Sequence, residues 1–550
     1  MRVLLLAGLG PTISAAELLT GSVFDANVRV RPQDDLSGFR VRSRDGDYPL
    51  LRPFRGTAKG LFDCPPGPYW RPIPHLTTLT LESILRHADV DYVTRATDEL
   101  WRGTLQGPDG PFDAVLLSTT FIWERRSLAR AIRWIEEWFP SVRIVLGGQY
   151  SNLKYRQILA NHPSVTAVVL GDAEVALPAL LNALDKGTDL SAVPNLALRD
   201  DSSGALRQTV LQYSDLELEP SPTVAGDAPV VPYESMRGCP FSCRFCSFPA
   251  ASPTWRYKSA EKIRDDFTRY RDRNGTRYVK ALDSTFTVPP ARLRRLLPML
   301  EGLDIGWEAY SRANALTGPD MVARLEASGC SSLALGFESM SDRSLSLMNK
   351  QVSASANRTA FELLSASGID YRVSFMVGYP GEFPTDFDST RRFLVEEYAG
   401  RFTLNVFSLS DETMPVWADA EHAGLVVSDP DDPDAEWSHV GMDRATANTL
   451  RRETLRDVRW ANDGAVHNLW QGLYEMPLAP TLSAKANLRI EKLIDRLGMV
   501  SVDFPDESEA RRRRHASEHA LDALGVDVGP VDQTRRATKP AAWVTRSVLS

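Results

Sequence analysis

Cysteine and histidine are both scarce in this chain of 550 residues, which has five cysteines and eight histidines. Three of the cysteines lie within one short segment, whereas Cys64 and Cys330 are far from it in the sequence. So few thiols, gathered in this way, exclude a secreted framework of disulfide bonds and indicate a metal or cluster site in an intracellular protein. We therefore expect a cytoplasmic location.

Long apolar runs are missing as well, since no stretch approaches the roughly 18 residues of a membrane-spanning helix. Neither charge sign dominates, because 63 Lys and Arg against 71 Asp and Glu give a net charge of −8. These absences argue against a membrane protein and against a broad nucleic-acid-binding face. The short apolar run over residues 2–8 is interpreted as a buried strand rather than as a signal peptide.

Strand and helix patterns alternate along residues 1–200. Strands are expected at 2–8, 90–97, 114–121, 143–148 and 165–171, and helices at 77–88, 125–139, 152–161 and 173–186. This alternation predicts an α/β domain with a doubly wound, Rossmann-like sheet, and such sheets bind ligands at the carboxyl ends of their strands. The small and polar candidates at those ends are Ser118, Thr119, Thr120, Gly147, Gly148, Gln149 and Gly171.

A second alternation begins at Val230, after a polar segment at 201–228 that is predicted to be a linker. Strands are expected at 230–236, 277–283, 305–311, 332–338, 371–377 and 402–408, with helices such as 290–301, 318–328 and 355–367 between them. Six βα units predict a partial (β/α)6 barrel of the TIM type over residues 229–410, with its chemistry on the carboxyl-end loops. Residues 411–550 are expected to form a mainly helical region that caps the barrel and shapes the substrate pocket.

Cys239, Cys243 and Cys246 follow the first predicted strand of the barrel in CxxxCxxC spacing. Three thiolates on one loop suit zinc or an iron–sulfur cluster. A structural zinc needs a fourth protein ligand, and no histidine lies between His162 and His422. Three thiolates on a four-iron cube would leave one iron open to a substrate, so the spacing favours a cluster over zinc.

The CxxxCxxC spacing, with Phe245 before the last cysteine, resembles the signature of radical S-adenosylmethionine (SAM) enzymes. Strings at 283–286, 307–312, 336–339 and 378–382 are similar to strings that this superfamily carries on successive strands. The resemblance implies that the three cysteines hold a [4Fe-4S] cluster and that SAM binds its open iron. By position, it assigns contacts with SAM to Glu338, Ser339, Arg372 and Ser374; the alternative for Glu338 is a surface ion pair.

The strings at 147–151 and 168–174, placed ahead of such a barrel, look like the cobalamin-binding domain of B12-dependent radical SAM proteins. Glycines let the backbone approach a bulky ligand, and the hydroxyl groups at 118–120 could bond its nucleotide tail. A plain flavodoxin-like domain is the alternative. The Asp-x-His-x-x-Gly motif of many B12 methyltransferases is absent. We therefore expect no histidine below the cobalt through that motif, and Arg71 or Tyr69 is the candidate for this position.

The resemblance covers roughly residues 1–410 and implies a cobalamin-dependent radical SAM methyltransferase. Such an enzyme moves a methyl group from SAM through methylcobalamin to an unreactive carbon of a natural-product precursor, as in antibiotic biosynthesis, and an amino acid such as tryptophan is one candidate substrate. Tyr310, on the third barrel strand, is the candidate residue next to the substrate. The implied partners are a small molecule and an electron donor such as flavodoxin or ferredoxin, with no nucleic acid and no membrane.

Two other functions stay open from the sequence. A B12-dependent radical SAM enzyme could catalyse a rearrangement or a cyclisation, and a non-catalytic metal-binding protein would use the cysteines without turnover. The sequence also leaves open whether methyl transfer follows a radical or a polar route.

Overall fold

The structure of the protein is a computed structural model. It describes residues 1–8, 39–43, 46–49, 75–108, 110–122, 124–200, 203–409, 412–430, 432, 435–467, 483–525 and 527–530. Cys64, Tyr69 and Arg71, the residues of the Pro-rich loop considered above, lie outside these ranges.

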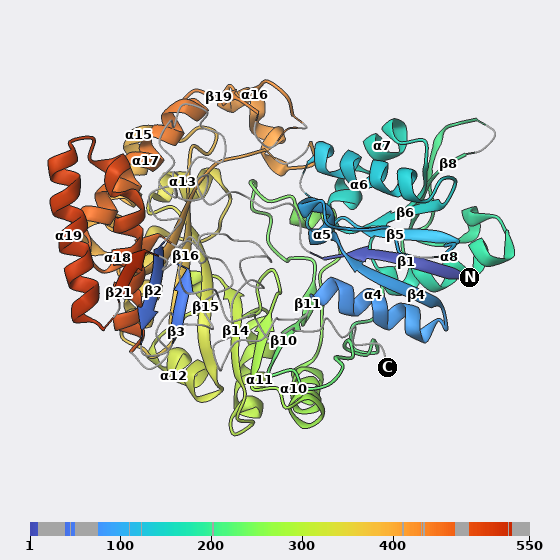
Figure 1. The fold of residues 1–550 in the computed structure, drawn as a ribbon, viewed down its shortest axis with the longest axis horizontal. Helices are drawn as coiled ribbons and strands as arrows, with labels where there is room; N and C mark the ends of the chain where they lie inside the picture. The colour runs from blue at the N-terminus through green and yellow to red at the C-terminus, as the bar shows by residue number, and fades with distance from the viewer. Residues whose placement is uncertain are drawn as a thin grey trace.

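The first domain is built on a seven-stranded sheet in the order β4-β1-β5-β6-β7-β8-β9 (Figure 1). Its five parallel strands are β1 Arg2–Ala7, β4 Asp91–Ala96, β5 Ala114–Ser118, β6 Arg143–Gly147 and β7 Val165–Val169. This is the flavodoxin-like order, in which the strand order reverses beside β1 and ligands bind at the carboxyl edge there. Two antiparallel strands, β8 Leu196–Arg199 and β9 Leu206–Gln208, complete the edge. The sheet thus extends into the segment 201–228 that the sequence predicts as a linker.

Helices cover both faces of this sheet. Helices α4 Leu76–His87 and α8 Ala173–Lys186 pack on one face, and α5 Thr97–Arg102, α6 Arg125–Trp138 and α7 Gln149–Asn161 pack on the other. Along β1, Val3 and Leu5 enter one core while Leu4 and Leu6 enter the other. A strand that is buried on both faces needs apolar side chains at every position, and this explains the uninterrupted apolar run at the start of the chain.

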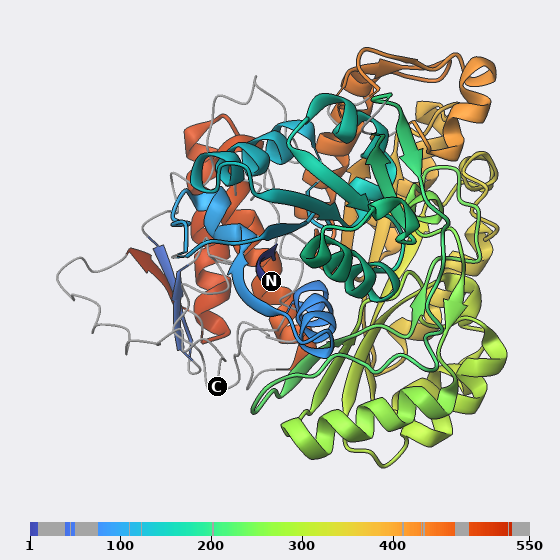
Figure 2. The ribbon, with the colours of Figure 1, turned by 90° about the vertical axis from the view of Figure 1, so that its right-hand side faces the viewer.

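The second domain is an open barrel of parallel strands, coloured from green to orange in Figure 2. Its strands are β10 Val230–Tyr233, β13 Tyr278–Ala281, β14 Gly306–Ser311, β15 Cys330–Glu338, β16 Asp370–Val377, β17 Gly400–Val406 and β20 Ala465–His467. The helices that connect them are α10 Ala260–Asn274, α11 Pro290–Leu300, α12 Pro319–Ala327, α13 Asp342–Leu347, α14 Ala354–Ser365 and α15 Pro384–Arg392.

The barrel sheet has seven strands in this structure, so the prediction of six strands is wrong by one. The seventh strand, β20, comes from the region beyond residue 410 and pairs in parallel with β17 through Gly400 and Ala465. It has only three residues, too few for a periodic pattern to be recognised in the sequence.

The other residues beyond 410 that the structure describes are mainly helical, as predicted. They form α16 Ala420–Ala423, α17 Arg444–Ala461, α18 Ala484–Asp503 and α19 Glu507–Ala523, together with the ribbon of β18 Val426–Val427 and β19 Trp437–Ser438. Buried Arg459 joins α17 to α18 through Asp495 at 3.0 Å and Asp503 at 2.7 Å. A small sheet pairs β2 Phe39–Ser43 with both β3 Gly46–Pro49 and β21 Asp527–Pro530.

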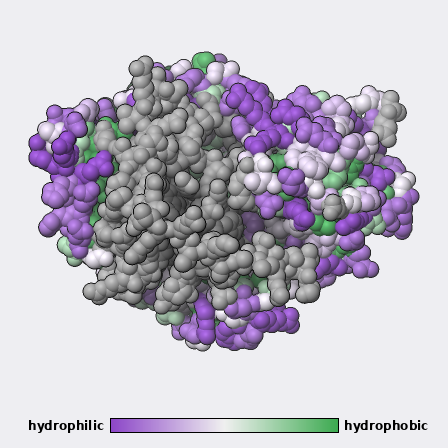
Figure 3. Space-filling model, viewed as in Figure 1, coloured by the Kyte–Doolittle hydropathy of each residue, from purple (hydrophilic) through white to green (hydrophobic). Residues whose placement is uncertain are grey.

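The described part of the surface is mostly hydrophilic in the view of Figure 3, with apolar side chains in small separate patches. Across the described ranges, no helix is long and apolar enough to span a membrane.

Candidate functional site

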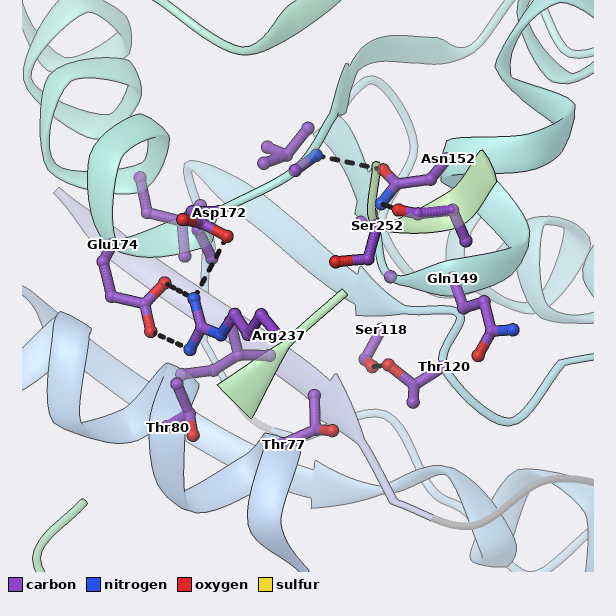
Figure 4. A pocket seen from close by; sticks show the side chains of 18 of the residues that line it. Thr77, Thr80, Ser118, Thr120, Gln149, Asn152, Asp172, Glu174, Arg237 and Ser252 are labelled. Atoms are coloured by element: carbon purple, nitrogen blue, oxygen red, sulfur yellow. Dashed lines mark hydrogen bonds and ion pairs between the residues drawn. The ribbon is translucent and has the colours of Figure 1, made fainter. Parts of the chain in front are cut away.

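A cavity of about 280 Å³ lies at the carboxyl ends of β5, β6 and β7, beside the point where the strand order reverses (Figure 4). The first domain lines it with residues that include Ser118, Thr120, Gly147, Gly148, Gln149 and Gly171, all of which the sequence predicts as cofactor contacts. The barrel domain closes the other side with Arg237, Phe248, Ala251 and Ser252. The cavity therefore lies between the two domains.

Gly148 shapes the wall of this first cavity. Its φ of +108° lies in a region that L-residues rarely adopt, and a Cβ atom there would lie 2.8 Å from the backbone nitrogen of Thr120. The two loops after β5 and β6 can therefore approach each other only with glycine at this position. This close approach leaves open space above the loops for a ligand.

Thr119 differs from its predicted role, because it is fully buried and the structure does not place it in the cavity wall. Its Oγ1 donates to the carbonyl oxygen of Gly147 at 2.9 Å and lies 2.7 Å from Ser151 Oγ. Thr119 thus ties β5 to β6 and α7, and it supports the cavity from behind.

The described residues that line the first cavity include no histidine. His75 caps α4 by accepting a hydrogen bond from the backbone of Thr78, and burial lowers the pKa of His75 to about 4. The ring of His87 lies on the same helix, with its Nδ1 2.6 Å from the carbonyl oxygen of Ser83. Both imidazoles therefore have partners within their own helix.

A second cavity of about 280 Å³ opens at the carboxyl ends of the barrel strands. Cys239, Cys243 and Cys246 all line it, and Cys243 is 7% exposed. Among the described residues, no three His, Cys, Asp or Glu side chains are grouped closely enough to hold a single metal ion. The three thiols thus border a shared space and do not meet at one point.

Burial raises the pKa of Cys246 to about 11, and the thiols of Cys243 and Cys239 add to this effect. The sulfur is therefore protonated at neutral pH in the metal-free protein, and a bound metal or cluster must displace the proton because the thiolate is the ligand.

Glu338 ends β15 in a left-handed conformation, with a φ of +64°. The pairing of β15 with β16 shifts register between Gly336 and Glu338, so the strand carries an extra residue at this point. The carboxylate of Glu338 folds back over Gly336, where a Cβ atom would lie 2.3 Å from its Oε1. Such local strain is typical of functional sites, and here it directs a carboxylate into the cavity that holds the cysteines.

Of the other three residues predicted to contact SAM, two line the second cavity and one does not. Arg372 and Ser374 line the second cavity with Glu338. Ser339 does not line it, because its side chain is fully buried and its Oγ lies 3.3 Å from Thr390 Oγ1 and accepts from the backbone of Ser341. Its observed contacts are therefore structural.

Tyr310 lines the second cavity, and a residue next to the substrate would have to do so. Its side chain is 42% exposed, and the guanidinium of Arg372 lies 5.4 Å from the centre of its ring. Cys330, by contrast, is buried at the start of β15 and contributes no sulfur to the cavity.

Sequence reasoning missed two buried cations in the second cavity, Arg312 and Lys350. Arg312 Nη1 donates to Cys243 Sγ at 3.6 Å, and its guanidinium carbon lies 3.8 Å from the ring centre of Phe241. Lys350 Nζ lies 3.0 Å from Glu338 Oε1. Both cations favour negative charge on the thiols and on a ligand beside them.

The two cavities are adjacent, and one short loop separates them. The loop after β11 Met236–Arg237 carries the three cysteines and continues into α9 Phe248–Ala251. Phe248 lines both cavities. A ligand in the first cavity and a ligand beside the cysteines would therefore contact opposite sides of the same loop.

Comparison with known proteins identifies the second domain. Residues 233–394 match the radical SAM superfamily. An uncharacterized methyltransferase of Pyrococcus horikoshii is 27% identical over 294 residues, which are 51% of this chain and 62% of that protein. The cobalamin-dependent radical SAM methyltransferase TokK of Streptomyces tokunonensis is 26% identical over 194 residues, 32% of this chain and 28% of TokK. A relative of a different kind is an anaerobic magnesium-protoporphyrin IX monomethyl ester cyclase of Rubrivivax gelatinosus.

Among solved structures, the fold is similar to that of the radical SAM methyltransferase TsrM from Kitasatospora setae, determined with cobalamin and a [4Fe-4S] cluster bound. The TM-score is 0.58 at 16% sequence identity, and the match covers 82% of this chain and 97% of TsrM. The chain spans less than two thirds of the length of the Pyrococcus methyltransferase and of TokK.

Residues 233–394 of the barrel are thus similar to the radical SAM superfamily. The resemblance to the cobalamin-dependent radical SAM methylases, which the cysteine spacing and the glycine-rich strand ends predict, is confirmed by these relatives.

Proposed function

We propose that this protein is a cobalamin- and SAM-dependent methyltransferase that methylates an unreactive carbon of a small natural-product precursor. The adjacency of the two cavities, with Phe248 in the wall of both, is the observation that carries the proposal. A methyl group relayed between two cofactors requires that both bind within reach of each other, since proximity and orientation make such a transfer fast. When bound, the cluster with SAM would supply reductive radical chemistry, and cobalamin would supply a carrier for the methyl group.

The residues around the second cavity fit a cluster and SAM. Three thiols from one loop border the cavity, and no fourth thiol from the described residues lines it. Two buried polar atoms of this lining, Thr285 Oγ1 and Arg312 Nε, have no hydrogen-bond partner within the protein. Buried polar groups are rarely left unpaired, so these two atoms indicate that a polar ligand completes the site. Glu338, Arg372 and Ser374 are the residues that would hold SAM.

The residues around the first cavity fit cobalamin. The cavity lies at the carboxyl edge of a flavodoxin-like sheet, where such folds bind bulky cofactors. Gly147 and Gly148 bring the backbone to its surface, and Ser118 and Thr120 supply hydroxyl groups. Leucine and valine side chains of the strands, such as Leu116 and Val145, add an apolar floor. This mixture of apolar wall and a few polar groups is typical of cofactor sites.

Tyr310 would contact the substrate at the mouth of the barrel, beside Arg372. Tyr310 is partly exposed at the cavity, and Arg372 lies over its ring. A cation held there suits a ligand with a carboxylate, which SAM and an amino acid such as tryptophan both have. An electron donor such as flavodoxin or ferredoxin belongs to the proposal for a radical route.

SAM with a deuterated methyl group tests the proposal. Anaerobically purified protein, reconstituted with iron, sulfide and cobalamin, is expected to give a product that carries the labelled methyl group, and omission of cobalamin is expected to abolish the label. Equal amounts of 5′-deoxyadenosine and S-adenosylhomocysteine would indicate the radical route, and S-adenosylhomocysteine alone the polar route. Conversion of a substrate without gain of the label would overturn the proposal of methyl transfer.

A cyclisation is the second candidate function, because one relative is named as a cyclase. The two functions predict different product masses. Methylation adds one CH₂ unit to the substrate, whereas ring closure adds no carbon.

A further inference from the structure

Asp172 connects the two domains at the rim of the first cavity. It follows β7, at the carboxyl edge of the first sheet, and it is 4% exposed. Arg256 Nη2 donates to its Oδ1 at 3.1 Å, and Nη1 of the same guanidinium donates to its Oδ2. Arg237 Nη1 lies 3.2 Å from Asp172 Oδ1. One buried carboxylate thus holds two guanidinium groups of the other domain.

These two arginines close the base of the cysteine loop. Arg237 ends β11 and Arg256 begins β12 Arg256–Tyr257, and the two residues pair directly in this antiparallel ribbon. The chain between them carries Cys239, Cys243, Cys246 and α9. The ribbon is tight, because a Cβ atom at Gly238 would lie 2.7 Å from the carbonyl oxygen of Thr254. A group that holds both arginines therefore holds both ends of the loop.

Both carboxylate oxygens of Asp172 accept hydrogen bonds. The backbone and the hydroxyl group of Ser214 donate to Oδ2 at 2.8 Å and 2.9 Å. Burial alone would raise the pKa of Asp172, but the two arginines outweigh it and hold this pKa at about 2. The carboxylate is thus charged at every pH at which the protein is handled.

Arg256 depends on this carboxylate more than Arg237 does. Arg237 also bonds Glu174 through both of its terminal nitrogens, at 2.9 Å and 2.6 Å, and Glu234 at 3.0 Å. In the described part of the chain, Asp172 is the one carboxylate within ion-pair distance of Arg256. Figure 4 shows Arg237 reaching between Asp172 and Glu174 across the cavity rim.

We propose that Asp172 is a positioning residue that fixes the cysteine loop against the first domain, so that the loop forms the wall between the two cofactor cavities. The inference rests on the proposed function for what the two cavities hold. The contacts of Asp172 with Arg237 and Arg256, called the clamp below, are a property of the protein without cofactors. Asn152 assists the clamp, donating to the carbonyl oxygen of Ala251 at 3.0 Å.

Amide hydrogen exchange of the intact protein tests the clamp. In the Asp172→Asn variant, peptides that cover residues 236–257 are expected to exchange at least tenfold faster than in the unaltered protein. Peptides of β15 are expected to keep their rates, because they lie in the barrel core. The matched control is Asp429→Asn, which removes another contact between domains, the ion pair of Arg125 with Asp429 at 2.8 Å, and both of these residues lie outside residues 236–257. This control is expected to leave 236–257 unchanged.

Two further variants separate positioning from general destabilisation. The double variant Asp172→Asn with Arg256→Gln removes the uncompensated guanidinium and is expected to recover the midpoint of unfolding, while the loop still exchanges faster. If Asp172→Asn alone does not fold, Arg256→Lys takes its place. This variant keeps the positive charge but loses the bidentate contact with Asp172, and the same local increase in hydrogen exchange of residues 236–257 is expected. Unchanged exchange of the loop in a folded Asp172→Asn or Arg256→Lys variant, or an equal increase in all peptides, overturns the clamp.

Cofactor content distinguishes the clamp from the proposed function. If the unaltered protein retains no corrinoid or iron after reconstitution, the proposed function is overturned, whereas the exchange result still decides the clamp. With the cofactors bound, Asp172→Asn is expected to retain iron but to broaden or shift the electron paramagnetic resonance signal of cob(II)alamin, because the loop moves relative to the first cavity. A signal identical to that of the unaltered protein would contradict the role in positioning.

Discussion

Lys350 Nζ lies 3.0 Å from Glu338 Oε1, and the two side chains are 7% and 10% exposed. This ion pair is buried in the cavity that the three cysteines line, and the backbone of Glu338 is held in a left-handed conformation to form it. A buried pair of this kind is weak evidence for a gain in stability. Its position beside the thiols indicates a role in ligand binding instead.

Replacement of Glu338 by Gln is expected to destabilise the protein by about 3–5 kcal/mol, because it leaves the buried ammonium of Lys350 without a countercharge. The same change is expected to weaken SAM binding without loss of iron. Urea unfolding and equilibrium dialysis with SAM would measure the two effects. Glu397→Gln is the matched control, since Glu397 pairs with Arg358 at the surface and such pairs contribute about 0–1 kcal/mol. Equal losses in the two variants would contradict the assignment.

Replacement of Cys239, Cys243 and Cys246 together by Ala is expected to abolish binding of iron and sulfide after anaerobic reconstitution. The unaltered protein is expected to bind about four iron atoms, as a single [4Fe-4S] cluster requires. Cys330→Ala serves as the control, because this thiol is buried at the start of β15 and lines neither cavity. Iron content is measured by a colorimetric assay, and a triple variant that still binds four iron atoms would refute the cysteine assignment.

Cobalamin bound to the protein is expected to have no histidine ligand from the described residues, since none of the first cavity's lining is histidine. The electron paramagnetic resonance spectrum of the cob(II)alamin form should therefore lack nitrogen superhyperfine splitting from a protein histidine. Splitting from a histidine that persists in a His75→Ala variant would point to a histidine other than His75. Splitting that this variant abolishes would contradict the structure around α4.

Glu382 is expected to make stability depend on pH. Its side chain is fully buried, and burial raises its pKa to about 7, although Ser344 and the backbone of Gly378 donate to it. The folded state holds this proton more tightly than the unfolded state, whose pKa is near 4.5. The stabilisation is therefore complete below pH 4.5 and is lost as the pH rises through about 7, by roughly 3 kcal/mol in total.

The Glu382→Gln variant checks this dependence, because its neutral amide can donate to Ser344 and accept from Gly378. The variant is expected to match the unaltered protein at pH 4.5 and to exceed it by roughly 3 kcal/mol at pH 8. Unfolding by urea across this range gives the difference directly. A difference that stays constant with pH would show that Glu382 does not carry the effect.

Much of the fold could be predicted because it follows from local hydrophobic patterns in the sequence. The five parallel strands of the first sheet and the first six strands of the barrel all lie where hydrophobic runs place them, within a few residues at each end. The strands missed in the two main sheets are β8, β9 and β20, which have four, three and three residues, and β9 is exposed throughout. Strands of this length are formed by their pairing partners and not by any pattern of their own.

The site could be predicted less completely, because its polar contacts are tertiary. The cysteines and the glycine-rich strand ends are visible as motifs, and the structure gathers them at two cavities. Arg312 and Lys350 reach the cysteine cavity from loops far along the chain. Arg312 ends the string 307–312, but the string did not show its role, and no motif includes Lys350. Thr119 and Ser339 show the opposite error, since both stand at the expected strand ends but their hydroxyl groups bond to neighbouring loops. Position at a strand end thus does not settle the direction of a side chain.

Phe248, in the wall of both cavities, also limits how the domains can be exchanged between related proteins. A first domain cut at the polar segment before Val230 would lack Phe248, Ala251 and Ser252, and its cavity would lose one side. It would also leave Asp172 facing water without its two guanidinium partners. Chimaeras that keep the loop of residues 236–257 with its own first domain should retain the first cavity, and a junction placed inside this segment should remove one side of it.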